Sequence, residues 1–276
     1  LLIPVNDIVV AGTYAYVAGE DGLRIVDIAT PVHPTVVGFL AAAKAHAVAV
    51  QGRYAYLAEA EGRLHIVDIA DPQQPVATAV RVFAATIDDL AVAGDYVYLA
   101  SDAGLDVINI ADPAKPRHAA LFITPNPAQA VAVAGTYAYL GSAANLLVLD
   151  IATPTAPIRK MDVALPGDAL AMTIANDTLY IAGGSSGLYL LDLAKPTQPT
   201  PTGLFTAAGV VLDVTVCGFY AYLADGAGGL RILLAKDAQH PVQASEYLTL
   251  GRVWDVATVG AYAYVSSDGA PNRFST

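Results

Sequence analysis

Carboxylates recur at one position of a repeating pattern in this chain. Four aspartates each stand nine residues before the second tyrosine of a Tyr-x-Tyr pair, and the other copies of the pattern have alanine there. Carboxylates that converge can act as general acids or bases, or can attract a cation. Together with four residues that stand one position earlier in the pattern, they make eight candidate binding residues: Asp7, His46, Asp88, Asp89, Gln129, Asp213, Trp254 and Asp255.

A second set of aspartates precedes turns that contain proline. An aspartate at such a place accepts hydrogen bonds from nearby backbone N–H groups, so we expect a structural role in the turn. Each repeating unit has at most one of them, which prevents them from converging on a single ion. The set is Asp27, Asp68, Asp150 and Asp192.

Two motifs of known catalytic sites are missing from the sequence. It has no His-Glu-x-x-His zinc motif and no Gly-x-x-x-x-Gly-Lys phosphate loop. Calcium needs six to eight oxygen ligands, and Asp225-Gly226-Ala227-Gly228-Gly229 alone offers too few. We therefore assign no catalytic, cofactor-binding or metal-ligating residue, with calcium or another divalent cation as the alternative.

The Tyr-x-Tyr pairs reveal the elements that position these residues. Their second members follow one another at intervals of 40 to 42 residues, at Tyr16, Tyr56, Tyr98, Tyr139, Tyr180, Tyr222 and Tyr264. Four residues before each stands Gly12, Gly52, Gly94, Gly135, Asn176, Gly218 or Gly260. Glycine replaced once by asparagine is typical of a tight hairpin turn that needs a positive φ.

Each of the six complete units contains four short apolar runs bounded by glycine and proline, which predicts four β-strands. The third run ends in Asp-Ile-Ala-x-Pro, as at Asp27 to Pro31. Four-stranded units at this period predict a β-propeller in a single domain, because radial closure protects the sheet edges. We expect seven blades, or alternatively six blades plus surplus strands. The units are 6–45, 46–87, 88–128, 129–169, 170–211, 212–253 and, as a partial unit, 254–276, and residues 1–5 resemble the end of an outer strand.

The first strand of each blade lines the central channel of a propeller, so the eight candidate residues are expected at its mouth. The turns between the second and third strands lie on the same face and carry Glu20, Asp21, Glu59, Glu61, Asp102, Asp225 and Asp268. This face is therefore predicted to be acidic and to favour a cation or a basic partner.

Charge and hydropathy exclude two classes of partner. The net charge of −11 is the wrong sign for a protein that neutralises nucleic-acid phosphates. No apolar run approaches the roughly 20 residues that span a bilayer. We expect a domain that is monomeric within a longer protein and has no membrane-spanning segment of its own.

The third strands resemble those of the LVIVD repeat family. The similarity is carried by Leu23-Arg24-Ile25-Val26-Asp27, Leu64-His65-Ile66-Val67-Asp68, Leu146-Leu147-Val148-Leu149-Asp150 and Leu188-Tyr189-Leu190-Leu191-Asp192. Unit three departs from this pattern with Asn109 in the aspartate position. Unit six departs with Leu234 in that position and with Ala238 where the first proline of the turn is expected. The resemblance implies an exported bacterial or archaeal surface protein without an assigned activity.

Three functions follow as hypotheses. The leading one is a non-enzymatic module that binds a protein partner, basic in character, or acts as a scaffold on the cell surface. The first alternative is a hydrolase or lyase whose site forms at the channel mouth from His46 and the four aspartates. The second alternative is a structural spacer within a larger surface protein.

Overall fold

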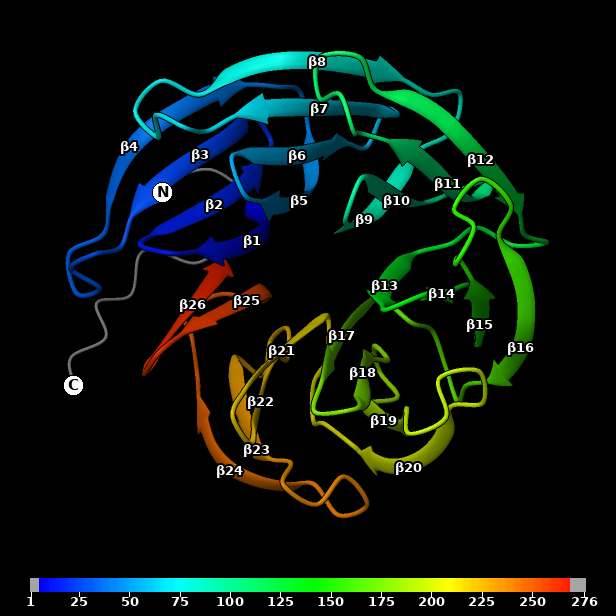
Figure 1. Cartoon of the computed structure of the whole chain (residues 1–276). Helices are drawn as coiled ribbons and strands as arrows, with labels where there is room; N and C mark the ends of the chain where they lie inside the picture. Colours follow the sequence, from blue (N-terminus) through cyan, green and yellow to red (C-terminus); the bar gives the residue numbers. More distant parts are fainter. Residues whose placement is uncertain (1–4, 269–276) are drawn as a thin grey trace.

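The computed structural model describes residues 5–268, which form only β-strands and connecting turns. Within this range no helix is available that could span a membrane. Neighbouring strands pair antiparallel, and the sheets stand around a central axis like blades (Figure 1).

The bounds of the strands, blade by blade, are as follows. Blade 1 contains β1 (Val5–Ala11), β2 (Tyr14–Gly19), β3 (Gly22–Asp27) and β4 (Thr35–Ala41), and blade 2 contains β5 (Ala45–Gln51), β6 (Tyr54–Glu59), β7 (Arg63–Asp68) and β8 (Val76–Val82). Blade 3 contains β9 (Ile87–Ala93), β10 (Tyr96–Ser101), β11 (Gly104–Asn109) and β12 (Arg117–Ile123), and blade 4 contains β13 (Ala130–Ala134), β14 (Tyr137–Gly141), β15 (Asn145–Asp150) and β16 (Ile158–Ala164). Blade 5 contains β17 (Ala171–Ala175), β18 (Thr178–Ala182), β19 (Leu188–Asp192) and β20 (Thr200–Phe205), and blade 6 contains β21 (Asp213–Cys217), β22 (Tyr220–Ala224), β23 (Leu230–Leu234) and β24 (Val242–Tyr247). The last sheet contains β25 (Val253–Val259) and β26 (Tyr262–Ser267).

The described chain forms six complete four-stranded blades and one two-stranded sheet. The prediction of a β-propeller with four-stranded antiparallel blades is confirmed, but seven complete blades are not supported. The alternative, six blades plus surplus strands, matches, because β26 has no third strand beside it within residues 5–268. Residues 1–4 and 269–276, which include part of the seventh unit, lie outside the described residues, and Val5 belongs to β1.

The two-stranded sheet lies between blade 6 and blade 1. Its inner strand β25 packs beside β21 on one side and β1 on the other, so the innermost strands form a continuous ring. Figure 1 shows β25 and β26 in orange and red between the blue strands of blade 1 and the orange strands of blade 6.

The turn between the first two strands of each unit adopts the predicted positive φ. Gly12 has a φ of 62° and Asn176 has a φ of 51°. In blade 1, Ala11 pairs with Tyr14, which leaves two turn residues, and glycine at the first of them matches a type II′ hairpin turn. In blade 5, Asp177 also has a positive φ, 55°, which is the type I′ alternative that Asn-Asp permits.

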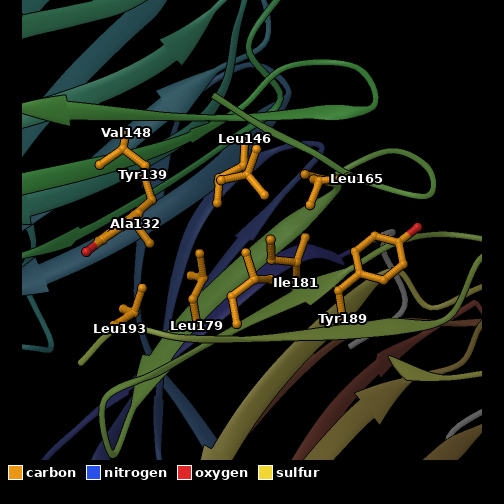
Figure 2. Close-up of a cluster of buried hydrophobic side chains, with 12 residues drawn as sticks. Ala132, Tyr139, Leu146, Val148, Leu165, Leu179, Ile181, Tyr189 and Leu193 are labelled. Carbon is orange, nitrogen blue, oxygen red and sulfur yellow. The ribbon is translucent and has the colours of Figure 1, made fainter. Parts of the chain in front are cut away.

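The core lies between neighbouring blades rather than at the axis. Figure 2 shows one such interface, in which Tyr139 and Val148 of blade 4 meet Leu179 and Ile181 of blade 5. Leu165, in the connection between the two blades, belongs to the same cluster. Because both faces of a central blade are covered, its strands are apolar on both sides, which explains the near-continuous apolar runs of the sequence.

Candidate functional site

The four aspartates of the first column lie at the beginnings of the inner strands, around one end of the central axis. Each carboxylate accepts a hydrogen bond from a backbone N–H group of the inner strand that follows it around the ring. The donor and acceptor pairs are Val48 N to Asp7 Oδ2 (2.6 Å), Val131 N to Asp89 Oδ2 (2.8 Å), Val256 N to Asp213 Oδ2 (3.0 Å) and Ile8 N to Asp255 Oδ2. These aspartates therefore link blades to one another.

Irregular pairing at the start of the donor's inner strand accompanies three of these links, those from Val48, Val256 and Ile8. The register of β1 with β2 shifts between Val5 and Asp7, and that of β25 with β26 shifts between Val253 and Asp255. A bulge of this kind interrupts the regular ladder of backbone hydrogen bonds and re-aims a side chain. An aspartate from the preceding blade then supplies an acceptor for the N–H group beside the irregularity, that of Ile8 for example.

Three of these carboxyl groups lie close to one another. Buried Asp255 neighbours both Asp7 and Asp213. Burial, together with the charge of Asp213, raises the pKa of Asp7 to about 7 and that of Asp255 well above its usual range. A raised pKa means that Asp7 and Asp255 keep their protons to a higher pH than an exposed aspartate does.

Asp89 lies apart from this trio along the ring. Its Oδ1 accepts a hydrogen bond of 2.7 Å from its neighbour Leu90 N, in addition to the bond from blade 4. Burial raises the pKa of Asp89 to about 7, and the charges of Asp7 and Asp213 act in the same direction. Within residues 5–268, no group of three or more His, Cys, Asp or Glu side chains has the arrangement of a metal site.

One residue before this column, the side chains differ between the two halves of the ring. Blades 1 to 4 supply polar residues and blades 5 and 6 and the two-stranded sheet supply apolar ones: Asn6, His46, Asp88 and Gln129, then Leu170, Leu212 and Trp254. His46 and Trp254 are exposed, whereas Asp88 and Gln129 are half-buried. Burial raises the pKa of Asp88, and the charge of His46 opposes this shift. The mouth is thus divided into a polar arc and an apolar arc.

The acidic turns on the same face are partly neutralised by neighbouring basic groups. Asp21 pairs with Arg24, and buried Glu59 accepts hydrogen bonds from Arg63 and from the backbone of Ala43. Three further contacts are Lys44 to Glu61 (3.4 Å), His65 to Glu59 (2.8 Å) and Arg231 to Asp225 (2.8 Å). Glu20, Asp102 and Asp268 remain exposed, and Asp268 accepts a hydrogen bond from Arg252 N. The face is less acidic than the residue count predicts.

An exposed apolar patch on this face was missed by sequence reasoning. Leu248 and Leu250 are 77% and 78% exposed in the connection from β24 to β25, and Trp254, at 40%, follows them. The guanidinium group of Arg252 lies 4.3 Å from the centre of the Trp254 ring. The available signal was the leucine pair itself, because the matching connection of blade 1 carries only Ala42, Ala43 and Lys44. We call Leu248, Leu250 and Trp254 the leucine patch.

The aspartates of the second column lie on the opposite face, at the ends of the third strands. Each accepts a hydrogen bond from the N–H group two residues further on, for example Ala29 N to Asp27 Oδ1 at 2.8 Å. Asp68, Asp150 and Asp192 make the same bond, as does Asn109. These carboxylates are thus occupied by their own turns.

Surface hollows lie at the connections between third and fourth strands, away from the channel mouth. One of about 440 Å³ is lined by Asn109, Lys115, Arg117 and His118, and another of about 400 Å³ by residues that include Leu234 and His240. His118 is tied to Asp106 at 3.1 Å, so its imidazole is already partnered. Neither hollow contains a channel-mouth residue.

Comparison with protein-family models identifies the repeat. The model described as "LVIVD repeat" matches residues 4–41, 42–79, 86–123, 126–164, 208–249 and 250–270. The chain belongs to the LVIVD repeat family. The fifth unit falls between the matched segments, yet it folds as blade 5 with all four strands, so its divergence in sequence has not changed the blade.

Two solved structures share the fold of this LVIVD repeat protein. The β-propeller domain of Cps50 (Swd1) from Myceliophteria thermophila superposes with a TM-score of 0.76 at 12% identity, covering 92% of this chain and 88% of that one. The computationally designed Ika8 protein superposes with a TM-score of 0.69 at 12% identity, covering 98% of this chain and 95% of the design. At this identity the likeness concerns the fold alone. No curated protein matches the sequence.

Proposed function

We propose that this LVIVD repeat protein is a non-enzymatic binding module at the cell surface, which holds a protein partner on the face of the channel mouth. The observation that carries the proposal is the leucine patch. Side chains as apolar as Leu248 and Leu250 are costly to expose, and an exposed apolar patch with a polar border is typical of a protein-binding site.

The surroundings of the patch favour a partner with basic residues around an apolar anchor. Exposed Glu20, Asp102 and Asp268 lie on the same face, and the whole chain has a net charge of −11. Charges at the border of an interface mainly steer association and select the partner, whereas the apolar centre supplies most of the affinity. The four column aspartates contribute indirectly, because their oxygens hold the blades together beneath this face.

Affinity capture from the native cell envelope tests the proposal. The wild type is compared with a triple variant, Leu248→Ser, Leu250→Ser and Trp254→Ser, and with a control, Val80→Ser and Val82→Ser, on exposed positions of outer strand β8. We expect a partner that the wild type and the control retain and the triple variant loses. A partner retained equally by all three would refute the patch, and no partner at all would favour a spacer.

The cell-surface location is tested separately. Intact cells that produce the protein are treated with an added protease, and the protein is followed by immunoblot beside a cytoplasmic marker. Loss of the protein while the marker survives supports export. Survival of both until the cells are lysed would contradict it.

A hydrolase or lyase site at the channel mouth is the second candidate. The observation that favours it is the buried cluster of Asp7, Asp213 and Asp255, because a carboxyl group with a pKa of about 7, as at Asp7, can act as a general acid or base near neutral pH. Against it, every column aspartate uses an oxygen on a backbone N–H group. Turnover of ester, glycoside or uronate substrates that is lost in Asp255→Asn, with folding retained, would establish this candidate in place of the binding module.

A further inference from the structure

The outer edge of β26 is unpaired within residues 5–268. In each of the six complete blades, the strand equivalent to β26 pairs with a third strand, as β6 does with β7. That pairing places Asp68 opposite Tyr54, Ile66 opposite Tyr56 and Leu64 opposite Ala58. Within residues 5–268 the last sheet thus has only the inner half of a blade.

Side chains that face the space beside the outer edge of β26 are less buried than the matching side chains of complete blades. Tyr222 and Ile232 of blade 6 are partly exposed, whereas the matching Tyr56 and Ile66 of blade 2 are 2% and 0% exposed. Tyr262 is 45% exposed, and the buried hydroxyl of Tyr264 has no hydrogen-bond partner in the described part of the chain. The space beside β26 is therefore bordered by apolar side chains from blade 6.

Blade 1 borders the same space on the other side. Its buried Val17 and Val26 form a small cluster with Val259 and Tyr264 of the last sheet. The interface between blades 4 and 5 contains twelve buried residues, whereas this cluster contains four. A strand added to β26 would lie between two apolar faces and so has to be apolar on both of its own sides.

The backbone of β26 also defines how an added strand would pair. In the antiparallel ladder of blade 2, the N–H groups of alternate residues of β6 point toward β7, starting at Ala55. The equivalent residues of β26 are Ala263, Val265 and Ser267. Sister blades set the register, with aspartate opposite Tyr262 and isoleucine opposite Tyr264.

We propose that the β26 edge, with the apolar faces of blades 6 and 1 beside it, binds a partner's β-hairpin that carries the repeat's own Leu-x-Ile-Val-Asp strand. Binding by strand addition gives affinity through backbone hydrogen bonds and specificity through the alternate side chains. The leucine and isoleucine would pack toward blade 1, as Leu64 and Ile66 pack toward blade 3. The valine would face blade 6.

A synthetic peptide that copies residues 62–82, the third and fourth strands of unit two, tests this inference on the full chain. We expect saturable binding, and protection from hydrogen exchange at the amides of Ala263 and Val265. The matched peptide control is N-methylation. Methylation at the His65 and Val67 positions blocks the edge that faces β26 and should weaken binding at least tenfold. Methylation at the Val80 position, on the outer edge of the hairpin, leaves both that edge and the pairing of the two strands intact.

A protein variant gives an independent readout. Ala263→Pro removes an N–H group that β25 does not use, so the hairpin of β25 and β26 is retained while strand addition is blocked. We expect the wild type to bind the peptide at least tenfold more tightly than this variant. Equal binding by both, or peptide binding without protection of β26, would overturn the inference.

A second copy of the chain is the competing occupant. Sedimentation of the wild type distinguishes it, because pairing of two β26 edges gives a dimer that dissociates in Ala263→Pro. A dimer of this kind that excludes the peptide would overturn the hairpin as the occupant. A monomer that binds the peptide supports it.

Discussion

The interface between blades 4 and 5 differs from the two interfaces beside the last sheet. Tyr139 is fully buried where two complete blades meet, whereas Tyr222 and Tyr264 are partly exposed. Blade 6 has all four of its strands, yet its Tyr222 is still uncovered. The comparison teaches that a blade tyrosine is buried by the outer strands of its neighbour and not by its own sheet alone.

The largest effect is expected from shortening the tyrosine in the complete interface. Tyr139→Ala should lower the free energy of unfolding by about 3 to 5 kcal/mol, the usual cost of removing a buried aromatic side chain. Tyr264→Ala should cost clearly less, because its site is already open on one side. Urea denaturation followed by fluorescence measures both.

Tyr139→Phe provides the control for the hydroxyl group, which donates a hydrogen bond of 3.1 Å to the Pro196 carbonyl oxygen. It should retain most of the stability that Tyr139→Ala loses. Equal costs for the alanine variants at positions 139 and 264 would contradict the comparison.

A smaller effect is expected from pH. The pKa of Asp7 is raised from 3.8 to about 7 in the folded protein, so folded molecules keep protons that unfolded molecules release between those values. Stability contributed by this group is complete below pH 4 and is lost as the pH rises through 7. The melting temperature should therefore fall by a few degrees between pH 4.5 and pH 8.

Asp255→Asn tests the origin of that slope. The amide oxygen still accepts the hydrogen bond from Ile8 N, but the buried titratable group at this position is removed, so the melting temperature should vary less with pH. The control is Asp192→Asn, far from the last sheet, which should keep the wild-type slope. An unchanged slope in Asp255→Asn would show that the trio does not control it.

The smallest effect concerns the turns, which should not distinguish the two regions. Asp27 lies in blade 1 beside the last sheet, and Asp192 lies in blade 5 between complete blades, yet each caps only its own turn. Replacing either with alanine should cost about 1 kcal/mol, the usual net contribution of one such hydrogen bond. Asparagine should be tolerated at both, as Asn109 is. Thermal denaturation of the four variants would detect unequal costs, which would mean that the turns also depend on neighbouring blades.

The fold could be predicted in detail because its signals are local and repeated. The glycine column and the single Asn176 specify a hairpin turn, and the Leu-x-Ile-Val-Asp runs specify the third strand. The number of complete blades could not be predicted in the same way. It depends on whether strands pair beside β26, and the residues of β26 read like those of any second strand.

The site was less accessible to prediction. The column of Asp7, Asp89, Asp213 and Asp255 indicated where the carboxylates lie, because position in the repeat determines position in the ring. What the carboxylates contact depends on bulges and on the neighbouring blade, which no single unit encodes. The pairing of Glu59 with Arg63 and His65 likewise arises between strands, and it reduced the expected acidity of the face.

Side chains distinguish the blades on both faces of the ring. On the face of the hairpin turns, the first turn residue always has a positive φ, but the second is threonine, arginine, aspartate, phenylalanine or alanine. On the other face each blade has its own side chains: Asp21 with Arg24 in blade 1, Glu59 with His65 in blade 2, and Trp254 with Arg252 in the last sheet. The backbone repeats around the ring, but side chains on both faces break its rotational pseudo-symmetry, so a protein bound to either face can adopt a single orientation.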